Sequence, residues 1–300
     1  MKRPLVAAAA LLLAALAPSA AGQTAIRTWE VFEVAVKAGA VLANPYVHGL
    51  PDGGEPLARV LFEGTDGEAK GKRYLIPAFW DGGGSWKVRF APPAPGEWSF
   101  QADSADPALG ALSGTLRATG WSEADKQTNP TRRGLVRVAE SGRYFVYADG
   151  TPFLWIGDTW WNWAKKGIEF SSFQKLADDR AAKGFTVGQI FFGGNGGLLD
   201  NTYSIPDLDQ IRKVERFIAY ANSKGITVWI HAWWSRKGLN ETVGPEKIRR
   251  WWRYVIHRLG AYNVIWVLAG EYNMNNYGGL GLQFWKELGA MIRAEDAYER

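Results

Sequence analysis

The chain has 300 residues, a formal net charge of +5, no cysteine and 16 tryptophans. The lack of cysteine excludes disulfides and a lipid anchor on an N-terminal cysteine. Basic residues are scattered among acids, and no nucleic-acid-binding motif accompanies them, so we expect no nucleic-acid partner. The densest basic run, over 247–253, predicts an amphipathic helix with its charges facing solvent.

Residues 1–22 have the composition of a secretory signal peptide. A basic start, Met1-Lys2-Arg3, precedes an apolar run over 5–17, and small residues near Ala21 suit cleavage. The run is shorter than the ~20 residues that span a bilayer, although an uncleaved anchor is the alternative. We therefore expect a bacterial protein that is secreted or periplasmic, with no membrane span after cleavage.

Residues 23–120 predict an N-terminal all-β domain. Short alternating segments, such as 59–63 and 86–90, are separated by turn residues, and helical periodicity is missing. This spacing is typical of an immunoglobulin-like antiparallel β-sandwich of about seven strands. The polar stretch over 121–133 then predicts a linker.

Residues 134–300 change to alternating strands and helices after a predicted hairpin over 134–149. Strands are predicted up to Asp158 and over 186–192, 226–232 and 264–269. Helices are predicted over 172–181, with a serine cap, and over 207–224, 245–259 and 282–294. Four successive βα units predict parallel strands that lie side by side in chain order.

Two architectures fit this alternation, a doubly wound sheet and a (β/α)8 TIM-type barrel. A doubly wound nucleotide-binding sheet normally carries a glycine-rich turn after its first strand, and Gly157-Asp158-Thr159 offers none. We interpret the glycine-rich segment 192–197 as an active-site loop, because it does not lead directly into a helix. A full barrel takes ~250 residues, so the sequence predicts a truncated barrel with about four βα units before Arg300.

Catalytic groups of barrels lie at the carboxyl ends of the strands, where this sequence places polar and aromatic residues. Glu271 follows the fourth strand and is the catalytic candidate. The substrate-binding candidates on the same rim are Asp158, Trp160, Trp161, Asn195, His231, Trp233, Trp234 and Asn273. Rings stack on sugars, and glycoside hydrolysis needs two carboxyls, one to protonate the leaving oxygen and one as nucleophile or base. A non-catalytic carbohydrate-binding surface protein could carry the same rim.

Each candidate also has a structural alternative. Glu271 could pair with an arginine, Asp158 could cap the turn after the first strand, and His231 could be a satisfied structural imidazole. The inner face of the barrel is expected to hold Trp155, Phe191, Trp229 and Trp266. The three histidines lie far apart in the sequence and no serine lies on a nucleophile elbow, so we predict no metal site and no cofactor.

Several motifs carry a resemblance to known domains. Gly142-Arg143-Tyr144-Phe145-Val146, then 149–160, and Arg180-Ala181-Ala182-Lys183-Gly184-Phe185 are similar to the opening of the apiosidase-like family of glycoside hydrolases. Phe79-Trp80-Asp81-Gly82 and the residues over 86–98 resemble the β-sandwich domain commonly found N-terminal to it.

The resemblance implies a retaining (β/α)8 hydrolase with an acid/base carboxyl after the fourth strand and a nucleophile from a later one. Glu271 falls on the acid/base position, where members often carry aspartate, and Gly270 stands where related barrels commonly have asparagine. The nucleophile is expected beyond residue 300, so this fragment alone should be inactive. The predicted function is an exported glycoside hydrolase of plant or microbial polysaccharide; its sugar, linkage and oligomeric state stay open.

Overall fold

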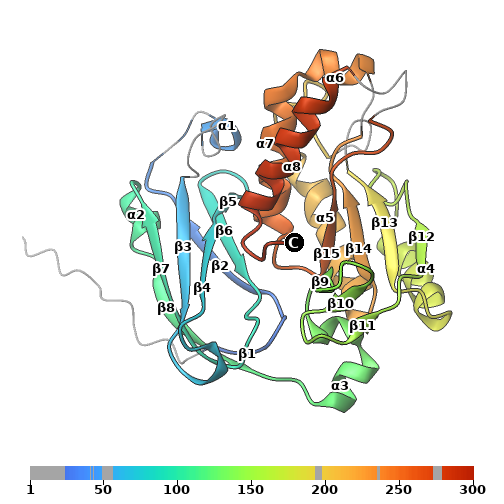
Figure 1. The fold of residues 1–300 in the computed structure, drawn as a ribbon. Coiled ribbons are helices and arrows are strands. Elements are labelled where there is room, and N and C mark those ends of the chain that lie inside the picture. The colour runs from blue at the N-terminus through green and yellow to red at the C-terminus, as the bar shows by residue number, and fades with distance from the viewer. Residues whose placement is uncertain are drawn as a thin grey trace, which may run out of the picture.

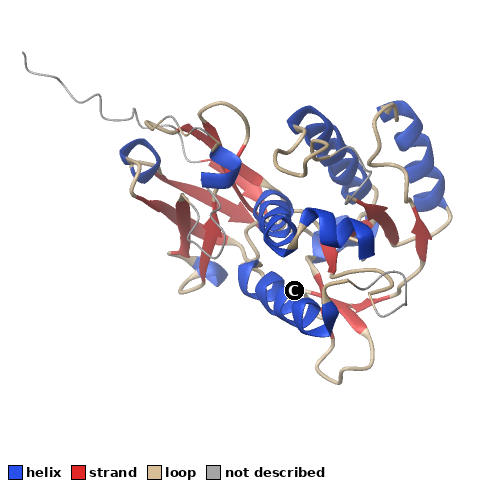
Figure 2. Cartoon of the chain, turned by 90° about the horizontal axis from the view of Figure 1, so that it is seen from above, coloured by secondary structure: helices blue, strands red, loops and turns tan. Residues whose placement is uncertain are grey.

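The computed structural model describes residues 24–40, 42, 44–48, 57–192, 198–234, 237–272 and 279–300. The predicted signal peptide, Asn195 and Asn273 lie outside these residues. Two parts lie side by side, with helices α7 (Pro245–Leu259) and α8 (Gly281–Glu295) between them (Figure 1). The view from above places the strands of the N-terminal part on one side and the second sheet with its helices on the other (Figure 2).

The N-terminal part consists of two packed β-sheets. One has the order β1-β8-β7-β3-β4, with β1 (Thr24–Arg27), β3 (Ala58–Gly64), β4 (Arg73–Pro77), β7 (Gly96–Ser104) and β8 (Ser113–Thr119). The other has the order β2-β6-β5, with β2 (Phe32–Lys37), β6 (Ser85–Phe90) and β5 (Phe79–Trp80). The short α1 (Pro45–His48), α2 (Pro107–Gly110) and η1 (Gly67–Ala69) lie between strands.

Alternation along the strands builds the core between these two sheets. Every second residue of β3 is buried, and Phe62 of β3 stacks on Phe90 of β6 with ring centroids 4.2 Å apart. The prediction of an all-antiparallel arrangement is wrong at one edge, because β1 pairs with β8 in parallel. A period-two pattern reports which face a residue occupies and carries no information on strand direction.

The segment predicted as a linker is ordered and packed. It contains α3 (Glu123–Thr128) and the 3₁₀ helix η2 (Pro130–Arg133). Ser122 and Asp125 form a reciprocal capping box that satisfies free backbone N–H groups at the start of α3. The Asn129 amide donates to the carbonyl of Asn222, at 3.0 Å, where α5 (Leu208–Ser223) ends.

The C-terminal part is built on a four-stranded parallel sheet, as predicted. Its strands β12 (Gly157–Thr159), β13 (Val187–Phe191), β14 (Thr227–His231) and β15 (Val264–Val267) lie adjacent in chain order. The connecting helices are α4 (Phe170–Ala182), α5, α7 and, unpredicted, the short α6 (Lys237–Val243). The predicted hairpin, β9 (Val136–Val138) and β10 (Phe145–Tyr147), is extended by β11 (Pro152–Phe153) into a small antiparallel sheet.

The two faces of the parallel sheet have different partners. Val228 and Ile230 of β14 are buried in the core that the helices cover. The opposite, inner face carries Trp229, which packs in a second cluster with residues of the small β9–β11 sheet. The prediction that Trp266 belongs to this inner face is wrong. It pairs with Ile230 in register, faces the helices and donates to Asp296 at 3.0 Å.

Two expectations about helix ends and charges are also corrected. Helix α4 begins at Phe170 after Glu169, so Ser172 lies inside its first turn and does not cap it. In α7, Arg250 is buried rather than facing solvent, and Arg253 pairs with Glu295 at 3.0 Å. Helix α8 packs against α7 and supplies Glu295, the partner of Arg253. Within the described ranges, no helix has both the length and the apolar character needed to cross a bilayer.

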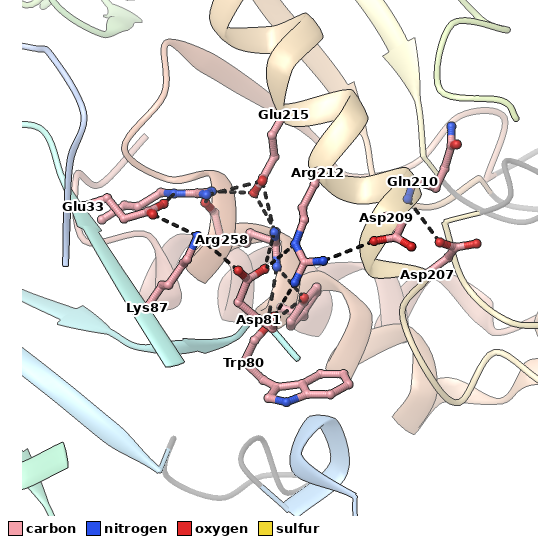
Figure 3. A network of polar contacts seen from close by, with 12 residues as sticks. Glu33, Trp80, Asp81, Lys87, Asp207, Asp209, Gln210, Arg212, Glu215 and Arg258 are labelled. Atoms are coloured by element: carbon pink, nitrogen blue, oxygen red, sulfur yellow. Dashed lines mark hydrogen bonds and ion pairs between the residues drawn. The ribbon is translucent and has the colours of Figure 1, made fainter. Parts of the chain in front are cut away.

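A buried network of charges joins the two parts of the molecule (Figure 3). Glu215 of α5 binds Arg89 of β6 and accepts from Arg258 of α7, with Arg258 Nε 2.6 Å from Glu215 Oε1. Arg258 also donates to Asp81 Oδ1, which follows β5, at 2.8 Å, and Lys87 lies 3.1 Å from Asp81 Oδ2. Burial alone would raise the pKa of Asp81, but the charges of Arg258 and Lys87 hold that pKa below its ordinary value.

Candidate active site

Four rings form what we call the aromatic rim, at the carboxyl end of the inner face: Trp161, Phe191, His231 and Trp234. The ring centroid of His231, the last residue of β14, lies 5.4 Å from that of Trp161 and 5.2 Å from that of Trp234. The two indoles are 5.5 Å apart and nearly perpendicular, and Phe191 lies 5.9 Å from Trp234. Adjacent parallel strands bring these residues to one edge of the sheet.

The predicted site contains two pairs of adjacent tryptophans, Trp160–Trp161 and Trp233–Trp234. Only the second member of each pair belongs to the rim. Trp160 is 1% exposed and packs on Phe173 of α4, while Trp161 is 37% exposed. Trp233 is fully buried and donates to Asn240 Oδ1 at 2.8 Å. Trp160 and Trp233 are therefore core residues, which corrects their assignment as substrate-binding candidates, because their rings are buried away from the rim.

The structure adds Gln189 to the candidate residues. Its side-chain amide is hydrogen-bonded to His231 Nε2. Burial lowers the pKa of His231 to about 4, and its Nδ1 atom has no partner among the described residues. A neutral imidazole can donate from one ring nitrogen and accept at the other, so His231 can hold the half-buried Gln189 amide in place without carrying a charge. The sequence signal for Gln189 is a lone amide at an inward position of an otherwise apolar strand.

Asp158 lies away from the rim. It is level with Gly188 near the start of β13 and points to the helix-covered face, where its Oδ2 lies 2.5 Å from Arg180 Nε of α4. Asp158 also accepts from the N–H of Thr159, at 2.8 Å. These contacts correct its assignment as a substrate-binding candidate, because the carboxylate already has partners on the opposite side of the sheet.

Glu271 follows β15 on the rim side of the sheet and is exposed. Its φ of 54° is in the left-handed region, which a non-glycine residue occupies at a cost of about 1–3 kcal/mol. The residue before it, Gly270, lies so close to Trp234 that an added Cβ would come within 2.4 Å of the ring. Glu271 is thus a carboxylate next to the aromatic rim.

Comparison with solved structures defines the class of fold. A protein from Bacteroides vulgatus assigned as a glycoside hydrolase is similar over 92% of this chain and 55% of its own, with 18% identity and a TM-score of 0.71. A glycoside hydrolase family 5 protein from Bacteroides vulgatus is similar over 56% of this chain and 39% of its own, with 19% identity and a TM-score of 0.48. The chain thus spans about half the length of the first structure and shares its fold over that part.

Family models identify both parts of the chain. The model of the apiosidase-like catalytic domain matches residues 139–299, and that of a domain of unknown function, DUF5060, matches residues 25–105. The chain belongs to the apiosidase-like family, as its opening motifs predicted. No curated protein matches it.

Proposed function

We propose that the chain is part of an exported glycoside hydrolase that acts on plant or microbial polysaccharide with retention of configuration. The observation that carries this proposal is the position of Glu271. It is an exposed carboxylate at the carboxyl end of a parallel strand, held in a left-handed conformation one residue after a contact with Trp234. Aromatic rings supply the binding surface of such a site, and Glu271 supplies one of the two carboxyl groups that glycoside hydrolysis needs.

In this proposal Glu271 is the general acid/base. It protonates the leaving oxygen while a second carboxylate attacks the sugar, and it then takes a proton from the water that releases the glycosyl intermediate. Trp161 and Trp234 offer faces for stacking on sugar rings, and the Gln189 amide, held by His231, binds hydroxyl groups. The nucleophile is expected from a strand beyond residue 300, about 5–5.5 Å from Glu271 in the complete site.

We further propose that the parallel sheet is the first half of a (β/α)8 barrel and that the N-terminal part is an immunoglobulin-like sandwich. The ordered series β12 to β15 supports the barrel. The exposed apolar side chains of Val138, Leu154 and Ile156 also support it, because further βα units would cover such surface. Residues 1–300 alone are then expected to be inactive.

Export is proposed from the sequence of residues 1–22. Expression of the gene with its native N-terminus should yield mature protein that begins near residue 22 or 23 outside the cytoplasm. N-terminal sequencing of that product tests this, and an intact Met1 on a membrane-bound product would identify an uncleaved anchor instead.

The test of the function is Glu271→Gln in the protein at its full natural length. We expect turnover on unactivated glycosides to fall at least ~100-fold, with a much smaller loss on substrates whose leaving group needs no proton. Glu287→Gln, on the exposed surface of α8, is the matched control and should leave turnover unchanged. Saccharide binding without any release of sugar by the unaltered protein would favour the non-catalytic alternative.

A further inference from the structure

The contact between Trp234 and Gly270 is closer than any other side chain at position 270 would permit. A Cβ built on Gly270 would lie 2.4 Å from Cη2 and 2.5 Å from Cζ2 and Cζ3 of Trp234. These three atoms form the outer edge of the six-membered ring. The φ of Gly270 is outside the left-handed region, so the backbone itself would accept alanine. The ring of Trp234 is therefore sufficient to make glycine necessary here.

Trp234 is held in this place from its other sides. Phe191, the last residue of β13, and His231, the last residue of β14, both contact its ring. Trp161, after β12, packs against it nearly edge-to-face. The indole therefore links the ends of three strands to the segment that follows the fourth, β15. Trp234 is half-buried, and these three neighbouring rings restrict where it can move.

The segment beyond this contact needs support. Glu271 directly follows Gly270, and its φ of 54° is a conformation that persists in a non-glycine residue only when surrounding structure holds it. A ring wedged against the preceding residue supplies such a constraint. We propose that Trp234 is a positioning residue whose six-membered ring, wedged against Gly270, holds the turn that directs Glu271 toward the aromatic rim. This inference rests on the proposed function of Glu271.

The test is a double-mutant cycle with Gly270→Ala and Trp234→Phe in the protein at its full natural length. In the unaltered background, Gly270→Ala should lower kcat on unactivated glycosides about 100-fold, the scale expected when a catalytic group is displaced by about 1 Å. Activated aryl glycosides, which need no protonation, should lose much less. In the Trp234→Phe background the same substitution should cost less than about tenfold, because phenylalanine lacks the atoms that clash.

Gly238→Ala in α6 is the matched control, since a Cβ there meets no atom within 4 Å, and it should leave kcat unchanged. Thermal unfolding of each variant separates misfolding from mispositioning. Equal losses from Gly270→Ala in both backgrounds, or no loss in either, would overturn the role of Trp234. Unchanged turnover in Glu271→Gln would instead overturn the proposed function, so the two failures are distinguishable.

Discussion

Burial of His231 ties the stability of the fold to pH. Its side chain is 3% exposed, and burial lowers its pKa to about 4 from an ordinary value of 6.5. Between these two values the unfolded chain binds more protons than the folded one. The contribution of His231 to the free energy of unfolding is therefore fully present above about pH 6.5. It is lost as the pH falls toward 4.

We therefore expect His231→Gln to flatten the pH dependence of unfolding. Between pH 7 and pH 5 the unaltered protein should lose about 2 kcal/mol more of its unfolding free energy than the variant. Urea unfolding of both proteins at the two pH values measures this difference. Parallel pH profiles would show that His231 is protonated without penalty in the folded state.

The adjacent residues Trp160 and Trp161 should have different roles, the first in stability and the second in saccharide binding. Trp161→Ala removes an exposed ring of the aromatic rim and should raise KM for saccharides about tenfold with little change in stability. Trp160→Ala, the matched variant one residue earlier, should lower the unfolding free energy by about 3–5 kcal/mol, because it empties a core position. An unchanged KM in Trp161→Ala would remove that ring from the binding site.

At the level of elements, the pair between Asp158 of β12 and Arg180 of α4 fixes a short strand to its helix. Both side chains are partly exposed, so the pair should be worth on the order of 1 kcal/mol or less. Asp158→Asn should lower the melting temperature slightly and leave KM unchanged. A double-mutant cycle with Arg180→Met measures the coupling, and a selective rise of KM would return Asp158 to the substrate site.

For the whole molecule, the network around Glu215 should make both parts unfold together. Glu215→Gln removes the negative charge that pairs with the buried guanidinium groups of Arg89 and Arg258. This change should destabilise the protein by about 3–5 kcal/mol. The pKa of Arg258 shows the same coupling: burial alone would lower it, but the charges around it raise it. Glu97→Gln breaks the exposed pair with Arg117 and should cost no more than about 1 kcal/mol.

Calorimetry of the unaltered protein should give one transition for both parts, and residues 121–300 produced alone should fail to fold cooperatively. Two well-separated transitions, or a Glu215→Gln variant as stable as Glu97→Gln, would show that the N-terminal part is an independent module.

The sequence by itself determined the order of the parallel strands and the place of Glu271. Apolar runs that alternate with capped helical stretches leave few ways to connect neighbouring strands, because crossovers are short and right-handed. The starts of two helices are also marked locally. Asp207 caps α5 and Pro245 is the first residue of α7, as predicted. The opening motifs over 142–160 also sufficed for the family.

Only the tertiary structure decided which tryptophan of the pairs Trp160–Trp161 and Trp233–Trp234 belongs to the rim. A strand as short as β12 has too few residues for alternation to define its faces, so nothing local separates Trp160 from Trp161. The partner of Asp158 lies 22 residues away on α4, and the contact of Gly270 with Trp234 spans two loops. Such contacts depend on how the strands and helices pack, and no periodic pattern in the sequence records the distance between two loops.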